Sequence, residues 1–212
     1  AVHQVRDRLT ARNGSRNGNG HSDKPWHDTD EPHVPTGNGQ ISLALQRLKE
    51  AAERADASCY SVIQPPGMRD HLPSIPVNPD ESAALATFVE HVDIVITVHG
   101  YGRRGLFGSL LLGGGNRPFA DHVGRSLRRT LPAYDIRTDI DTIPQQLRGL
   151  HPANPVNLPR DGGVQIELPP RVRGSSPLWW DWEGPGLTPH TESLIAGLAD
   201  AATSWTTPVD SD

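Results

Sequence analysis

Apolar residues follow two alternating patterns along the chain, one typical of helices and one typical of strands. From residue 41 to residue 55, leucines and alanines recur every three or four positions, which predicts a helix with one apolar face. The sequence VDIVITV at residues 92–98 is a nearly continuous apolar run, typical of a strand covered on both faces of a sheet. Shorter strand patterns occupy residues 58–65, 109–114 and 162–169.

Three further segments predict helices, at residues 78–92, 116–131 and 188–203. The first opens with Asn78 as N-cap and Pro79 at the first helical position, and the last has Thr188 as its cap. Helices that alternate with buried strands predict an α/β fold, here a three-layer αβα arrangement around a mostly parallel mixed sheet. Ligands of such sheets gather beyond the carboxyl ends of the strands.

Residues 1–39 differ in composition from the rest of the chain. They are rich in Gly, Asn, Asp, Pro and His and contain few side chains to bury, which predicts a disordered or loosely attached segment. One domain at residues 40–205 is expected to hold the core, and residues 206–212 form a short tail.

Charge, hydropathy and motifs argue against several classes of protein. The net charge of −5 disfavours general nucleic-acid or membrane-surface binding, and no apolar run approaches the ~18 residues of a membrane span. With Cys59 as the one cysteine, an intramolecular disulfide and a cysteine-rich zinc site are impossible. Since no signal-type leader is visible, the cytoplasm is the expected location. The sequence has no Walker, dinucleotide-binding or G-x-S-x-G motif.

The predicted central strand ends on an unusual cluster, HGYGRRG at residues 99–105. His99 lies at the carboxyl end of the strand, Gly100 leaves space beside it, and Arg103 would donate hydrogen bonds to an anion. The cluster is consistent with a ligand site, or with a strand that leads into an ordinary glycine turn.

The strand pattern at residues 162–169 contains a carboxylate. Alternation places Gln165 and Glu167 on one face and the apolar residues on the other. Such a carboxylate is costly to bury unless it is paired, linked to a metal or at the strand mouth, and a desolvated one suits general acid–base chemistry. The structural alternative is a Glu at the sheet edge that pairs with Arg171 or Arg173.

Two loops offer further candidates. Asn154 and Asn157, in a proline-containing loop, would be either substrate donors or turn formers. His71 lies near Arg69 in another loop, where it would be either solvated or part of a site.

Several of these segments together resemble the poly-γ-glutamate hydrolase family, whose members are also labelled phage-related replication proteins. The resemblance covers roughly residues 41–200 in the same order and spacing, through the sequences RADASCYSVIQPPGMRDHLPS, HVDIVITVHGYGRRG, LLLGGGNR, LRGLHPANPVNLPRDGGVQIELPPRVRG and PHTESLIAGLA. It implies a zinc-carboxypeptidase-like fold and zinc-dependent cleavage of γ-glutamyl amide bonds in acidic polymers. By this resemblance, His99 is a zinc ligand and Glu167 the general base. The residues expected near the substrate are His71, Arg103, Asn157 and Arg173.

The chain departs from the family pattern at the first metal motif. Family members carry an H-G-G-x-x-E-like motif before the first helix, and Thr36 and Ile41 stand where its His and Glu are expected. Neither side chain replaces an imidazole or a carboxylate as a zinc ligand. Two alternatives stay open: the site is compromised, or residues of the N-terminal segment complete it. The candidates for that replacement are His27, Asp30 and His33.

The sequence therefore predicts a metal-dependent γ-glutamyl hydrolase, impaired if nothing replaces the missing ligands. The alternative from a different class is a non-catalytic protein that binds acidic polymer or a protein partner through the same cleft and arginines. No nucleic-acid partner is expected, because the chain is acidic and carries no recognised binding motif.

Overall fold

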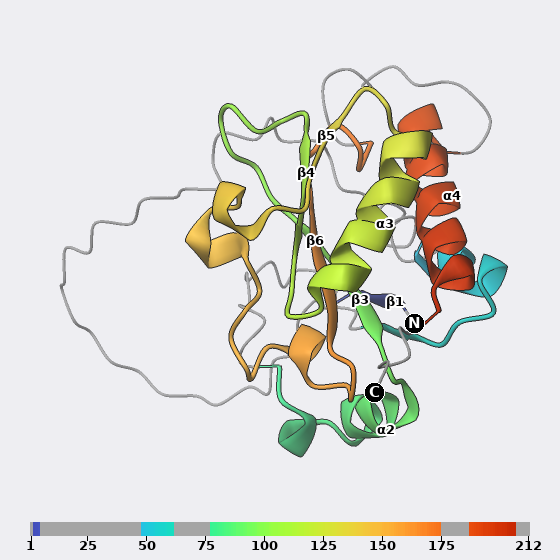
Figure 1. The fold of residues 1–212 in the computed structure, drawn as a ribbon. Helices are drawn as coiled ribbons and strands as arrows, with labels where there is room; N and C mark the ends of the chain where they lie inside the picture. Colours follow the sequence, from blue (N-terminus) through green and yellow to red (C-terminus); the bar gives the residue numbers. More distant parts are fainter. Residues whose placement is uncertain (1, 5–47, 62–76, 175–186, 207–212) are drawn as a thin grey trace, which may run out of the picture.

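The computed structural model describes residues 2–4, 48–61, 77–174 and 187–206. In this part of the chain the strands are β1 (Val2–Gln4), β2 (Cys59–Ser61), β3 (Val95–Gly100), β4 (Ser109–Gly113), β5 (Asp135–Arg137) and β6 (Gly163–Leu168). They form one sheet in the order β2-β1-β3-β6-β4-β5 (Figure 1). Every neighbouring pair is parallel except β4 with β6, so the prediction of a mostly parallel mixed sheet is confirmed.

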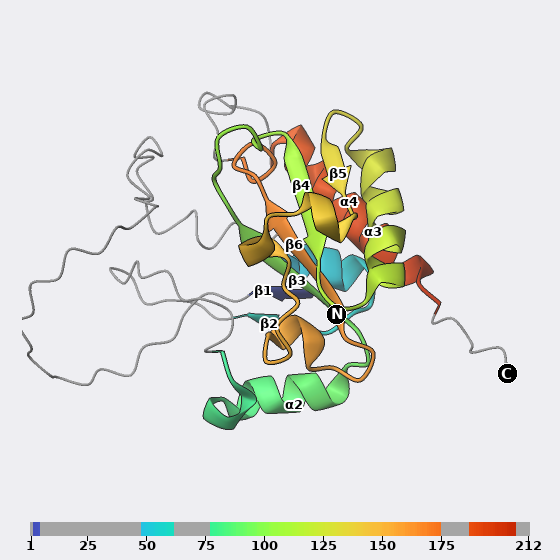
Figure 2. The ribbon, with the colours of Figure 1, turned by 60° about the vertical axis from the view of Figure 1, so that its left-hand side comes forward.

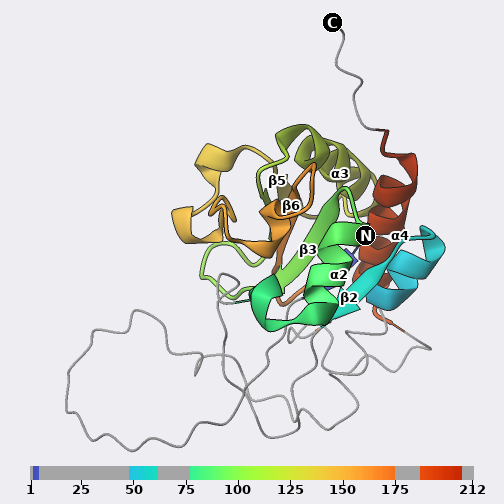
Figure 3. The ribbon, with the colours of Figure 1, turned by 90° about the horizontal axis from the view of Figure 1, so that it is seen from below.

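Helices cover both faces of this sheet. They are α2 (Ala83–His91), α3 (Arg117–Thr130) and α4 (Pro189–Ser204), and residues 48–54 are also helical. α3 and α4 lie side by side on one face, and Figure 3 shows segment 48–54 next to α4. α2 lies apart from this pair (Figure 2) and covers the opposite face, where Phe88 packs against Val95. The predicted αβα layering is confirmed.

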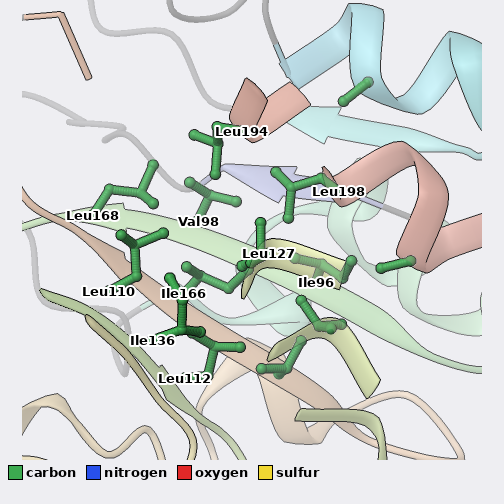
Figure 4. Packing of buried hydrophobic residues seen from close by; sticks show 14 of the residues in the cluster. Ile96, Val98, Leu110, Leu112, Leu127, Ile136, Ile166, Leu168, Leu194 and Leu198 are labelled. Carbon is green, nitrogen blue, oxygen red and sulfur yellow. The ribbon is translucent and has the colours of Figure 1, made fainter. Parts of the chain in front are cut away.

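The main core lies between the sheet and the pair of helices α3 and α4. Ile96 and Val98 of β3 and Ile166 of β6 meet Leu194 and Leu198 of α4 there (Figure 4). Each of these side chains is buried, and full burial of an aliphatic side chain contributes roughly 1.5–3 kcal/mol. Because apolar residues fill every second position of β3 and β6, the residues between them face the opposite side of the sheet.

Strand β1 lies within the segment 1–39 that is expected to be disordered or loosely attached. Val2–Gln4 pair in parallel with β2 and with β3. Backbone hydrogen bonds of this kind require no apolar side-chain pattern. Residues 5–39 lie outside the described part of the chain, as does the tail from residue 207.

The helix predicted from residue 78 begins later than expected. Asn78 caps a 3-10 turn at Pro79–Glu81, and its side chain accepts from the backbone N–H of Asp80. The chain then restarts at Ser82, whose hydroxyl oxygen accepts from the backbone N–H of Leu85 and caps α2. Two capping residues four positions apart therefore split the predicted helix. Among the described helices, none is both long and apolar enough to cross a bilayer.

Candidate functional site

His99 and Glu167 lie side by side near the carboxyl ends of the two central strands. β3 and β6 pair in parallel, and their register sets His99 opposite Glu167. Both residues alternate with core side chains, so both point to the face away from α3 and α4. The structure therefore brings together the two residues predicted as metal ligand and base.

Glu167 is buried, with 5% of its surface exposed. Burial raises the pKa of its carboxyl to about 7, because the ionised form loses hydration. The hydrogen bond from Gln165 and the charges of Arg173 and Arg103 oppose this rise. A carboxyl with such a pKa is populated in both protonation states near neutral pH, so it can take up and release a proton.

Two amide side chains extend the site along β6. Gln165 Nε2 donates to Glu167 Oε1 at 2.9 Å, and Asn154 Nδ2 donates to Gln165 Oε1 at 2.9 Å. Both amides are buried. The sequence alone predicts only that Gln165 shares a strand face with Glu167, which is the one signal that points to it. Asn154 is the residue that the sequence offers as a substrate donor or a turn former.

Arg173 lies directly against the end of β3. A Cβ on Gly100 would lie 3.0 Å from Arg173 Cζ, and Arg173 Nη2 donates to the carbonyl oxygen of Tyr101 at 3.4 Å. The absence of a side chain at Gly100 therefore makes room for the guanidinium. Arg171, the other candidate partner of Glu167, lies over the ring of Tyr134, with Cζ 5.4 Å from the ring centre.

Tyr101 anchors the loop at residues 101–108 that carries Arg103. The Tyr101 hydroxyl lies 2.8 Å from the carbonyl oxygens of Leu106 and Ser109, to either of which it can donate. Burial raises the pKa of Tyr101, so the hydroxyl stays a neutral donor at physiological pH. The loop brings the charge of Arg103 close enough to influence Glu167.

Asn157 is not brought to Glu167. Its Oδ1 accepts from the backbone N–H of Gly115 at 2.9 Å, and its Nδ2 donates to the carbonyl oxygens of Gly149 and His151. These contacts join three loops near the amino end of β6, whereas Glu167 lies near its carboxyl end. These are the contacts expected of the turn-forming role, and the contact with substrate stays a prediction.

The remaining predicted site residues lie outside the described part of the chain. They are His33 and His71, together with the positions of the first metal motif, Thr36 and Ile41, and the candidate replacements His27 and Asp30.

The described residues fit only part of a zinc site. No group of three or more His, Cys, Asp or Glu side chains among them is arranged to hold a metal ion. His99 supplies one imidazole, and Glu167 lies opposite it in the ladder. Protein zinc sites use three or four protein ligands, so these residues alone do not complete one.

The chain is similar to poly-γ-glutamate hydrolases in sequence and in fold. The family model described as poly-gamma-glutamate hydrolase matches residues 35–176. A bacteriophage poly-gamma-glutamate hydrolase of known structure shares 18% identity and a TM-score of 0.56, with 74% of each chain covered. A zinc-free apo structure of YNDL shares 15% identity and a TM-score of 0.57, with 77% of each chain covered. No curated protein matches the chain.

At these identities the two structural matches show a shared fold, in agreement with the predicted carboxypeptidase-like α/β architecture. The family model shows more than a shared fold, because it matches more than half of the chain. The matched residues include the strands that carry His99 and Glu167. By this match, the chain belongs to the poly-gamma-glutamate hydrolase family.

Proposed function

We propose that this protein hydrolyses γ-glutamyl amide bonds in acidic polymers of the poly-γ-glutamate type. Membership of the family supports the substrate class. The observation that carries the proposal is the buried Glu167, whose pKa is raised to about 7, opposite His99 at the mouth of the central strands.

Glu167 is proposed as the general base and acid of the reaction. In its ionised form it accepts a proton from the attacking water, and the resulting carboxylic acid donates that proton to the leaving amine. Both steps require that the carboxyl changes protonation state near neutral pH, which its raised pKa permits.

Arg103 and Arg173 are proposed to hold carboxylates of the substrate. Every residue of a γ-linked glutamate chain carries a free α-carboxylate, and arginine pairs with carboxylates through two parallel hydrogen bonds. The charges of both side chains already act on Glu167, which supports their position at the mouth of the site.

Zinc dependence is a further part of the proposal, with His99 as one ligand and His33 as a candidate second ligand. A solved structure with this fold is described as a zinc-free apo form, and this description supports the proposal. The described residues supply one imidazole, so further ligands would have to come from the remainder of the chain. We therefore assign no step to the metal.

A second function is favoured by the incomplete ligand set. If no other residue completes the site, Arg103 and Arg173 would still bind acidic polymer or an acidic partner, and no bond would be cleaved. Polymer binding that persists in excess chelator, without products, would identify this function.

The test of the proposed hydrolase is cleavage of poly-γ-glutamate, followed by the shift in polymer length on size-exclusion chromatography. The wild-type protein, with its zinc content measured in the same preparation, should shorten the polymer. Glu167→Gln should lose cleavage by a factor of roughly 10²–10⁴. The exposed Glu90 on α2 provides the matched control, Glu90→Gln, which should retain full activity. Equal rates for Glu167→Gln and wild type would refute the assigned base.

A further inference from the structure

A chain of hydrogen bonds with a fixed direction ends on Glu167. The backbone N–H of Val156 donates to Asn154 Oδ1 at 3.2 Å, and Asn154 Nδ2 donates to Gln165 Oε1 at 2.9 Å. Gln165 Nε2 then donates to Glu167 Oε1 at 2.9 Å. Each of the two amides accepts one hydrogen bond through its oxygen and donates one through its NH₂ group.

The direction of this chain is set at its backbone end. A peptide N–H can only donate, so Asn154 must turn its oxygen toward Val156 and its NH₂ toward Gln165. Gln165 must in turn present its oxygen to Asn154 and its NH₂ to Glu167. If either amide were flipped, two donors or two acceptors would face each other in a buried environment, where unmet polar groups are costly.

Gly149 closes the amide of Gln165 from a third side. Its φ is +63°, and a Cβ there would lie 2.7 Å from Gln165 Oε1. The backbone of the loop at residue 149 therefore approaches the amide as closely as a residue without a side chain allows. Gln165 is held by a donor, by an acceptor and by this close backbone contact.

We infer that Asn154 and Gln165 are positioning residues that orient the Glu167 carboxyl, by holding Oε1 and leaving Oε2 as the oxygen that acts on the substrate. Oε1 accepts from Gln165 in every arrangement that keeps the chain of hydrogen bonds satisfied, so the buried amide fixes which carboxyl oxygen is turned away from it. This inference rests on the proposed function only where it concerns reaction rate, because the direction of the hydrogen bonds is a property of the folded protein.

Two substitutions at Asn154 separate positioning from a purely structural role. Asn154→Asp keeps an oxygen that caps Val156, but its second oxygen can only accept, so the Gln165 amide must flip and present its oxygen to Glu167. Asn154→Ala loses the cap, and the Gln165 amide can then adopt either of its two orientations. The inference predicts that kcat for poly-γ-glutamate cleavage falls roughly 10–100-fold in Asn154→Asp, and less in Asn154→Ala, with KM nearly constant. A role limited to capping the turn predicts the reverse order, since Asp caps as well as Asn does.

Glycine substitutions provide an independent, matched pair. Gly149 and Gly162 have almost the same φ, +63° and +64°, so alanine strains the backbone similarly at both positions. A Cβ on Gly162 would have its nearest neighbour at 4.0 Å, whereas one on Gly149 would press on the Gln165 amide. Gly149→Ala should therefore lower kcat several-fold more than Gly162→Ala does, and its clash with Gln165 should also cost more thermal stability than the backbone strain that the two variants share. Equal kcat values for the two variants would contradict the role of Gln165.

An NMR measurement tests the same inference without any activity. In the wild-type protein the Gln165 side-chain NH₂ protons should show nuclear Overhauser contacts to the Glu167 Hγ protons, and these contacts should disappear in Asn154→Asp. If they are absent in the wild type, or persist in Asn154→Asp, the inferred direction is wrong. If they behave as expected but the wild type cleaves no γ-glutamyl polymer, the proposed function fails and the positioning of the amide stands.

Discussion

The burial of Glu167 makes the free energy of unfolding depend on pH. Its ordinary pKa is 4.5, and burial raises the value in the folded protein to about 7. Below pH 4.5 the carboxyl is neutral in both the folded and the unfolded chain. Between these two values the folded protein holds a proton that the unfolded chain has released, so the free energy of unfolding falls as pH rises.

We expect this loss to amount to about 3 kcal/mol between pH 4.5 and pH 8. Glu167→Gln removes the titrating group, so the difference in unfolding free energy between wild type and variant should change across this range. Urea denaturation of both proteins in chelator, at several pH values, measures it. Parallel curves for the two proteins would show that Glu167 titrates normally.

Gly100 matters for the space it leaves to Arg173. A Cβ there would lie 3.0 Å from the guanidinium carbon, so Gly100→Ala should displace Arg173 from its position. The loss of one charge-assisted contact with substrate is worth roughly 1.5–3 kcal/mol, and partial displacement should raise KM about fivefold. Gly108→Ala is the control in the same loop region, because nothing lies within 4 Å of a Cβ at that position. Equal KM values for the two variants would contradict the role of Arg173.

At the scale of elements, the long periodic segments were predictable from sequence, whereas two of the short strands, β1 and β5, were not. β3, β4, β6, α3 and α4 were each expected within a few residues, because repeated apolar positions specify both the element and its buried face. β1 and β5 contain three residues each, too few for any period, and pairing with neighbours decides them. The antiparallel direction of β4 also depends on the path of the chain rather than on its own sequence.

For the candidate site too, the positions of some residues were predictable from sequence and the roles of others were not. His99 and Glu167 were predictable because each stands at the end of a strong strand pattern, and their pairing follows from the order of strands. The roles of Gln165 and Asn154 depend on hydrogen bonds between a strand and a distant loop, which a linear pattern does not contain. The three contacts of Asn157 with backbone groups also join distant loops, and its contact with substrate stays a prediction.

A proline in strand β1 should lower the stability of the protein. His3 is level with Tyr60 on one side and Thr97 on the other, so β1 has a hydrogen-bonding neighbour at both edges. His3→Pro removes a backbone N–H inside the sheet and should lower the free energy of unfolding by about 3 kcal/mol. His3→Ala keeps the N–H and should have a much smaller effect. If thermal melting finds the two variants equally stable, β1 does not contribute to the sheet as the structure has it.

At the scale of the whole molecule, the two faces of one sheet have separate tasks. The face under α3 and α4 holds the main aliphatic core, and the opposite face carries His99, Gln165 and Glu167 on its central strands. Strand alternation produces this division, since each residue added to a strand switches sides. A rigid core behind the central strands holds the polar residues in a fixed register, as a catalytic site requires.

If Glu167 is the base and His99 a zinc ligand of the same site, as proposed, substitutions at the two residues should affect the same reaction step. The most direct test is a double-mutant cycle on kcat/KM for poly-γ-glutamate cleavage, with His99→Ala, Glu167→Gln and the double variant. When two residues act on the same step, the first substitution already removes most of the rate acceleration that they provide together. The kcat/KM of the double variant should therefore be about as low as that of the slower single variant. Losses that multiply in the double variant would show that the two residues act independently and would contradict a shared catalytic site.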